Sequence, residues 1–236
     1  MTQAKQVPLG VGFYPDWWFK NYGISFGREY YYASAYRVEA QAKMQKALHE
    51  RFGDVGLGSP DPEPRPLITF GMPLLPAVFG CEVVFEDAAV PWANPANLSK
   101  AACDKLTRPD LSTVSPVKEM LAQMDDLKST YGKVVGDLNV TGVQNLALKL
   151  RGEELYIDYF EDPDFCHRLL TFCSECIIDL WQLVYPITGT GAMDVTPMCD
   201  PSIFCVPNCT VEQISGDTYA AFGLPYDNML AEACHP

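Results

Sequence analysis

Short apolar segments alternate with segments of helical pattern along most of this chain, and this alternation constrains its fold most strongly. The apolar segments span residues 54–58, 81–85, 133–140 and 193–198. Strands that alternate with helices predict a parallel α/β arrangement. Four such strands would be half of the eight in a β/α barrel. We therefore expect an α/β fold of the (β/α)8 TIM-barrel type, with only about the first half of the barrel in this chain.

The first 53 residues differ in character from the rest. Residues 1–24 are aromatic and irregular, and we expect either an arm that packs on a neighbouring surface, such as that of a dimer partner, or a lid over a pocket. Ser25 is the predicted N-cap of a long helix that ends at Gly53. Arg37, Lys43 and Glu50 lie off its apolar face and are expected to contact solvent. That face carries Tyr32, Tyr36, Ala40, Met44, Leu48 and Phe52. Residues 54–236 would then hold the partial barrel, giving one domain overall.

Composition and charge exclude several classes of protein. The 236 residues are 48% hydrophobic and 20% charged, which is typical of a globular chain. The net charge of −13 disfavours binding to nucleic acid and to anionic membranes. No apolar run approaches the ~20 residues of a membrane-spanning helix. The nine cysteines are odd in number, and the N-terminus lacks the apolar core of a signal peptide, so we expect reduced thiols and a cytoplasmic protein.

Two helices meet at Asp162-Pro163 within the segment 152–178, GEELYIDYFEDPDFCHRLLTFCSECII. An aspartate followed by proline is a typical N-cap and first helical position. Two further helix signals are equally local. Ser115-Pro116 opens a helix whose buried side is expected to hold Met120, Leu121, Met124, Leu127 and Tyr131 before Gly132 ends it. Ser215 is expected to cap a helical segment that carries Tyr219 and Phe222.

The chain resembles the uroporphyrinogen decarboxylase superfamily from roughly Asp54 to its end. The segment 152–178, with its preceding arginine and its order Arg-Gly, Glu-Asp-Pro and His-Arg-Leu-Leu, is one part of the resemblance. Residues 80–87 (GCEVVFED) are similar to the family's strand that ends in Phe-x-Asp. Residues 214–219 and 222–226 (FGLPY) resemble its Ser-Pro-Glu-x-Tyr and Leu-Pro-Tyr stretch, with Gly216-Asp217 in place of Pro-Glu. The superfamily holds tetrapyrrole decarboxylases and methyltransferases that serve corrinoid proteins.

The resemblance implies a β/α barrel with its site at the C-terminal ends of the strands, as in other such barrels. Asp87 matches the decarboxylase aspartate that contacts the pyrrole nitrogens, and is the catalytic candidate; the alternative is a solvated loop acid. Asp137 and Asn139 alternate on one face at the end of the strand at 133–140, where they line the pocket or bond within the barrel. Gln144 and Asn145 begin the next helix and could face the same opening.

Departures from the family favour its methyltransferase branch. The decarboxylase phrase Arg-Gln-Ala-Gly-Arg, which binds substrate carboxylates, is absent. Leu148 aligns near the family's substrate-contacting tyrosine, and Cys209 near its serine. A highly carboxylated porphyrinogen would therefore find few cations in the pocket.

The methyltransferase branch uses zinc to hold and deprotonate a thiol acceptor. Its His-x-Cys phrase is absent, so the chain looks truncated at the C-terminus and the main zinc ligands are expected beyond Pro236. Cys199, Cys205 and Cys209 are the local candidates for metal ligands, and Asp200 and Cys209 are further candidates for substrate binding. The pair Cys173-x-x-Cys176 is instead expected to pack as small apolar residues.

Three functions follow in order of preference. The first is a methyltransferase that moves a methyl group between a corrinoid, carried by a partner protein, and a thiol or related acceptor. The second is a lyase that decarboxylates a cyclic tetrapyrrole. The third is a non-catalytic interaction subunit, or a fragment completed by another chain. Because a half barrel has open sheet edges, we expect a homodimer or hetero-oligomer in each case.

Overall fold

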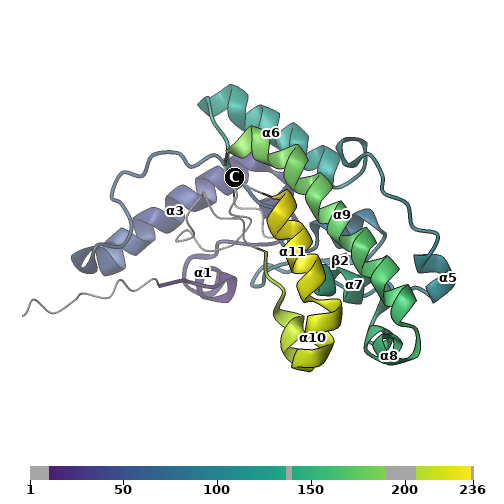
Figure 1. Cartoon of the computed structure of the whole chain (residues 1–236). Helices are drawn as coiled ribbons and strands as arrows, with labels where there is room; N and C mark the ends of the chain where they lie inside the picture. The colour runs from purple at the N-terminus through teal and green to yellow at the C-terminus, as the bar shows by residue number, and fades with distance from the viewer. Residues whose placement is uncertain (1–10, 137–139, 190–205, 235–236) are drawn as a thin grey trace, which may run out of the picture.

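The computed structural model describes residues 11–136, 140–189 and 206–234. Helices make up most of this part of the chain (Figure 1). The α-helices are α1 (Pro15–Tyr22), α2 (Arg28–Tyr32), α3 (Ser34–Phe52), α4 (Leu74–Val78), α5 (Lys100–Cys103), α6 (Val117–Tyr131), α7 (Val143–Arg151), α8 (Glu154–Glu161), α9 (Pro163–Thr188), α10 (Gly216–Phe222) and α11 (Leu224–Ala233). The 3-10 helices are η1 (Gly53–Val55), η2 (Leu111–Thr113) and η3 (Cys209–Gln213), and the strands are β1 (Leu67–Ile68), β2 (Val83–Val84), β3 (Trp92–Ala93) and β4 (Val135–Gly136).

A parallel pair of strands, β1 and β4, lies in the core. Leu67 pairs with Val135 and Ile68 with Gly136. Helices α3 and α6 pack on β1, and Leu67 and Ile68 are buried. The parallel strand predicted at 133–140 is thus confirmed in part, while the one at 193–198 lies outside the described residues. The described strands form two two-stranded sheets, so the fold is partly α/β, and a closed barrel is not among its described features.

The strand predicted at 81–85 is wrong in its pairing. Its centre, β2, pairs antiparallel with β3, with Val83 opposite Ala93. A parallel partner needs a crossover of a dozen or more residues, and the connection from Val84 to Trp92 is too short for that. Both β2 residues are only half-buried, as expected for a hairpin at the surface.

The strand predicted at 54–58 is also wrong. This segment begins with η1 and continues as a turn. Gly56 and Gly58 both have positive φ, which an extended strand does not allow. At Gly58 a side chain would also meet the backbone of α3, since an ideal Cβ would lie 2.3 Å from the carbonyl oxygen of Gln45.

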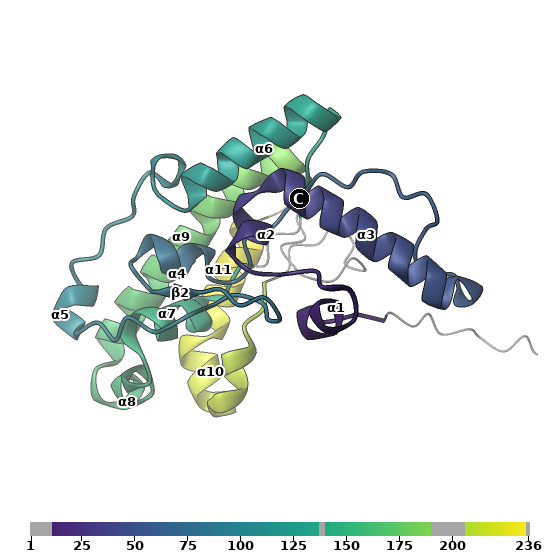
Figure 2. The same ribbon diagram turned by 180° about the vertical axis from the view of Figure 1, so that it is seen from behind.

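The N-terminal region is more helical than its sequence indicates. Residues 15–22 form α1, which begins with Pro15 and ends at Gly23 in a left-handed conformation. The long helix predicted from Ser25 is two helices, α2 and α3, because Ala33 between them is extended (φ −116°, ψ 100°). Figure 2 shows α1 lying under α3. A second hydrophobic cluster joins these helices through Trp18, Ile24, Phe26, Tyr30, Tyr31, Ala40, Met44 and Ala47.

Arg37, predicted to contact solvent, is 0% exposed. Its guanidinium donates to the carbonyl oxygens of Leu67 (2.7 Å) and Tyr30 (2.8 Å). It also donates to Oε1 of Gln123 on α6, at 2.9 Å. Burial lowers the pKa of Arg37 to about 10, with the neighbouring tyrosines acting in the opposite direction. Arg37 therefore joins α2, β1 and α6 through hydrogen bonds rather than an ion pair.

The helices of the second half agree closely with the predicted ones. Asp162 caps α9 by accepting a hydrogen bond from the backbone of Phe165, and Ser215 caps α10 through the backbone of Thr218. Gly132 ends α6 with positive φ, although Tyr131 is exposed rather than buried. Helix α9 packs against α7, α8 and α11 and lies at the centre of the main hydrophobic core (Figure 1). Within the described residues, no helix combines the length and apolar character that crossing a bilayer requires.

Candidate functional site

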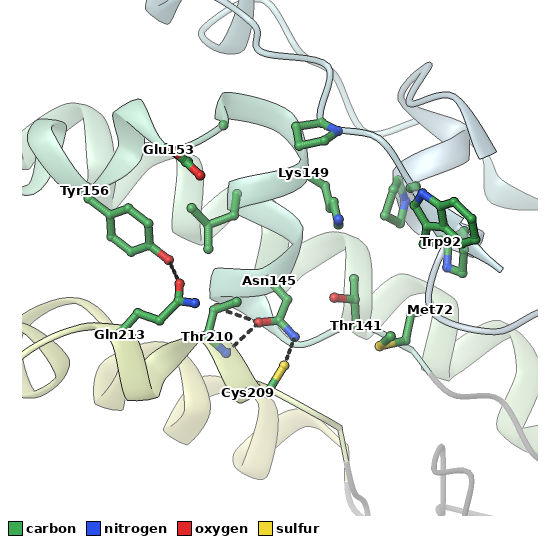
Figure 3. A pocket seen from close by; sticks show the side chains of 16 residues that line it. Met72, Trp92, Thr141, Asn145, Lys149, Glu153, Tyr156, Cys209, Thr210 and Gln213 are labelled. Carbon is green, nitrogen blue, oxygen red and sulfur yellow. Dashed lines mark hydrogen bonds between the residues drawn. The ribbon is translucent and has the colours of Figure 1, made fainter. Parts of the chain in front are cut away.

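A cavity of about 300 Å³ lies beyond the C-terminal ends of the two parallel strands. Met72 and Pro73 follow β1, and Thr141 follows β4, so both strands lead into its wall. The carboxyl end of a parallel sheet is where open α/β folds and β/α barrels bind their ligands. The lining residues are Met72, Pro73, Pro76, Trp92, Ala93, Pro95, Thr141, Asn145, Leu148, Lys149, Gly152, Glu153, Tyr156, Cys209, Thr210 and Gln213 (Figure 3).

Asn145 of α7 fixes one wall of the cavity. Its amide nitrogen donates to the carbonyl oxygen of Pro207 at 3.1 Å and lies 3.6 Å from Sγ of Cys209. Its amide oxygen accepts from the backbone nitrogen of Thr210 at 3.1 Å. Gln144 adds a bond to the carbonyl oxygen of Thr210 at 2.8 Å. Two adjacent amides of α7 thus hold the segment that carries Cys209, which Figure 3 shows beside Asn145.

Tyr156 closes the opposite side of the cavity. Its hydroxyl donates to Oε1 of Gln213, which ties α8 to η3 (Figure 3). Burial raises the pKa of Tyr156, and nearby Glu153 and Cys209 raise it further. The phenol therefore stays neutral and serves as a hydrogen-bond donor at neutral pH.

The turn between α7 and α8 is held by a buried ion pair just behind the cavity wall. Nε of Arg151 lies 2.7 Å from Oδ2 of Asp158, and Nζ of Lys100 lies 3.0 Å from Oδ1 of the same carboxylate. Gly152 between the two helices has positive φ and packs against Asn97, whose Oδ1 would lie 2.1 Å from an added Cβ. These contacts fix the direction of α8 relative to α7.

Of the residues predicted from the sequence, Asn145 and Cys209 come together in this cavity. Gln144 is buried directly behind the wall. Asp137, Asn139, Cys199, Asp200 and Cys205 lie outside the described residues. The functions expected of all these residues stay predictions.

Asp87 lies elsewhere. It is exposed in the β2–β3 hairpin and is not a lining residue of the cavity. Oγ of Ser25 donates to Oδ1 of Asp87 at 2.6 Å, and the backbone nitrogen of Phe26 donates to its carbonyl oxygen at 2.8 Å. β2 is not a strand of the parallel sheet, so Asp87 does not follow the carboxyl end of that sheet, and its expected catalytic role stays a prediction. Its position agrees with the alternative of a loop acid, here bonded to the N-terminal region.

Lys149 and Tyr156 line the cavity but were not singled out from the sequence. Lys149 lies four residues after Asn145 on α7, so the two share one helix face, and this spacing was the available signal. Trp92 and Tyr156 come from a hairpin and a different helix. No local pattern brings them to the same cavity.

The described residues contain no group of three or more His, Cys, Asp or Glu side chains that could hold a metal ion. Cys173 and Cys176 are buried, as expected of small apolar residues, and burial raises the pKa of both thiols. Cys209 is the single exposed cysteine of the described chain. A zinc ion would therefore need ligands in addition to Cys209 from outside the described residues.

Comparison with solved structures shows a similarity of fold. The structure is similar to that of a methyltransferase from Methanosarcina mazei, with a TM-score of 0.56 and 15% sequence identity. The similarity covers 92% of this chain and 58% of the methyltransferase, so the chain spans little more than half the length of that protein. No protein-family profile matches the chain. No curated protein matches it either.

Proposed function

We propose that this chain provides the substrate cavity of a methyltransferase that moves a methyl group between a corrinoid, carried by a partner protein, and a thiol or related acceptor. The observation that carries the proposal is the position of the cavity beyond β1 and β4, in a fold similar to a methyltransferase. The resemblance to the uroporphyrinogen decarboxylase superfamily agrees with it. We propose further that the parallel pair belongs to a (β/α)8-type barrel completed by other residues or another chain.

The cavity residues suit a small acceptor. Met72, Leu148 and Trp92 give the cavity apolar walls. Asn145 holds the segment of Cys209, and the neutral hydroxyl of Tyr156 donates to Gln213 and holds α8 to η3. In the proposed transfer, the acceptor thiol would release its proton to solvent, and its sulfur would form the bond to the methyl carbon. The bond from that carbon to the corrinoid breaks, and its electron pair stays on the corrinoid.

Zinc would supply activation of the thiol in the methyltransferase branch. Cys209 alone among the predicted ligands lies in the described cavity, and a single thiolate does not hold zinc. The described cavity residues by themselves therefore do not form a zinc site. A metal site formed by Cys199, Cys205 and Cys209 stays a proposal.

The cavity favours methyl transfer over decarboxylation of a tetrapyrrole. A porphyrinogen carries several carboxylates, and its binding requires several cations. The lining residues include one lysine and no arginine. A volume of about 300 Å³ is at the small end for ligand pockets and suits a small molecule better than a macrocycle.

The test is a methyl-transfer assay with methylcobalamin as donor and a panel of thiols as acceptors, with methylated product read by mass spectrometry. We expect product with the native chain, and a much lower rate after Asn145→Ala, which frees the segment of Cys209. Asn21→Ala, on the exposed side of α1, is the matched control. Product formation that is equal in native, heat-denatured and Asn145→Ala protein would overturn the proposal.

A further inference from the structure

Lys149 brings a positive charge into an otherwise mostly apolar cavity. It lies in the last turn of α7 and is half-buried. Figure 3 shows its side chain pointing into the space bordered by Thr141 and Trp92. Glu153, the one carboxylate of the lining, is exposed and lies apart from Lys149 (Figure 3).

The ammonium group of Lys149 has no counter-ion or hydrogen-bond acceptor within the described part of the chain. Two other lysines do contact carboxylates in the described residues. Lys43 pairs with Glu39 on the outer surface, and Lys100 pairs with Asp158 at a helix junction. A half-buried ammonium without a partner is costly unless a ligand or water satisfies its donors. The cavity therefore offers to an anionic ligand a cation that is unpaired within the described residues.

The backbone around Lys149 is held in place before any ligand binds. Its carbonyl oxygen accepts from the backbone nitrogen of Ala96 at 2.8 Å and from Sγ of Cys81 at 3.3 Å. The ion pair of Arg151 with Asp158 fixes the helix end two residues later. A preorganised cation loses less entropy on binding than one on a mobile loop.

The other lining residues determine which apolar part of a ligand fits the cavity. Trp92 and Tyr156 present aromatic rings from opposite sides, and Met72, Leu148 and the prolines add apolar surface. Aromatic and proline faces pack well against flat apolar groups. The rest of the protein works against anions, since its net charge is −13. Selectivity for an anion must therefore come from the local contact with Lys149.

We propose that the cavity binds a small, flat, apolar molecule with one anionic group, and that Lys149 binds that group. The inference names the class of substrate that the proposed methyltransferase site binds. It rests on the proposed function only in treating the bound molecule as a substrate. A carboxylate bound to Lys149 would lie at the β3 side of the cavity, with its apolar body directed toward Leu148 and Tyr156.

The test uses benzoate as probe, with benzamide as its neutral counterpart and acetate as an anion without an apolar body, all measured by calorimetry on the full chain. We expect benzoate to bind about tenfold more tightly than either. Lys149→Met, which keeps the apolar stem, should abolish this preference, and Lys149→Arg should keep it. Lys46→Met, an exposed change on α3 with the same loss of charge, should bind benzoate as the native chain does.

Equal binding of benzoate and benzamide by the native chain overturns the inference, and that comparison needs no variant to fold. Unchanged benzoate affinity in a folded Lys149→Met protein overturns it as well. The two proposals fail separately. Methyl transfer without benzoate binding removes only this inference, whereas benzoate binding without methyl transfer to any thiol removes only the proposed function.

Discussion

The side-chain amide of Asn145 lies 3.6 Å from the sulfur of Cys209, although 64 positions separate them in the sequence. Asn145 is also the residue that pairs with both Pro207 and Thr210, so it determines where the cysteine lies. Together with Gln144, which donates to the carbonyl oxygen of Thr210, this buried amide of α7 positions the candidate site.

Asn145→Ala should destabilise the protein by about 2 kcal/mol, because the half-buried backbone nitrogen of Thr210 loses its partner and the carbonyl oxygen of Pro207 keeps only the bond from Gly142. Urea unfolding measures this change. The exposed amide of Asn21 bonds only to the carbonyl of Trp17, so Asn21→Ala should cost well under half as much. Equal losses in the two variants would mean that Asn145 does not hold the 207–210 segment.

Cys209 should be the cysteine of the described chain that a water-soluble alkylating agent modifies first. Burial raises the pKa of Cys103 and Cys234 to about 11, and that of Cys166 and Cys176 to about 12. At neutral pH these thiols are protonated as well as shielded, and thiolate is the reactive form. Peptide mapping after brief iodoacetamide treatment measures the order of modification. Faster labelling of Cys166 than of Cys209 would contradict the structure.

Asp87→Asn and Ser25→Ala should each lower the free energy of unfolding by less than about 1 kcal/mol, since their hydrogen bond is exposed. The double variant should lose little more than either single one, because both remove the same contact. The same proteins test the catalytic role expected of Asp87. Loss of methyl transfer in Asp87→Asn but not in Ser25→Ala would favour catalysis over attachment of the N-terminal region.

Arg37→Met should be among the most destabilising single changes, at roughly 3 kcal/mol, because it leaves several buried oxygen atoms without donors. The affected acceptors include the carbonyl oxygens of Leu67 and Tyr30 and the amide oxygen of Gln123. Thermal unfolding compares it with Lys43→Met on the exposed face of the same helix. Similar unfolding temperatures for the two variants would show that the buried bonds contribute little.

Helix boundaries could be predicted because their signals are local. Asp162 and Ser215 cap their helices through side chains that bond three residues ahead, and Gly132 ends α6 through its own φ angle. The pairing of Val83 and Val84 could not be predicted, since an apolar pair suits either a surface hairpin or a buried strand.

Burial of Arg37 and the cavity itself depend on residues far apart in the sequence. Arg37 is satisfied by acceptors up to 86 positions away, so its helix period alone placed it wrongly on the solvent side. The cavity combines segments after β1, in β3, after β4, at the α7–α8 turn and in η3. Asn145 and Cys209 were reached through the family resemblance and their places beside predicted elements, whereas the sequence signal for Lys149 was its spacing of four residues from Asn145.

The most direct test of the account is the methyl-transfer rate of Leu148→Trp, in which a larger side chain fills the cavity. Leu224→Trp, at an exposed position on α11, adds the same ring away from the site. The account predicts that Leu148→Trp retains the fold but loses most methyl transfer from methylcobalamin to thiol, while Leu224→Trp matches the native rate. Equal rates in the two variants would show that methyl transfer does not take place in this cavity.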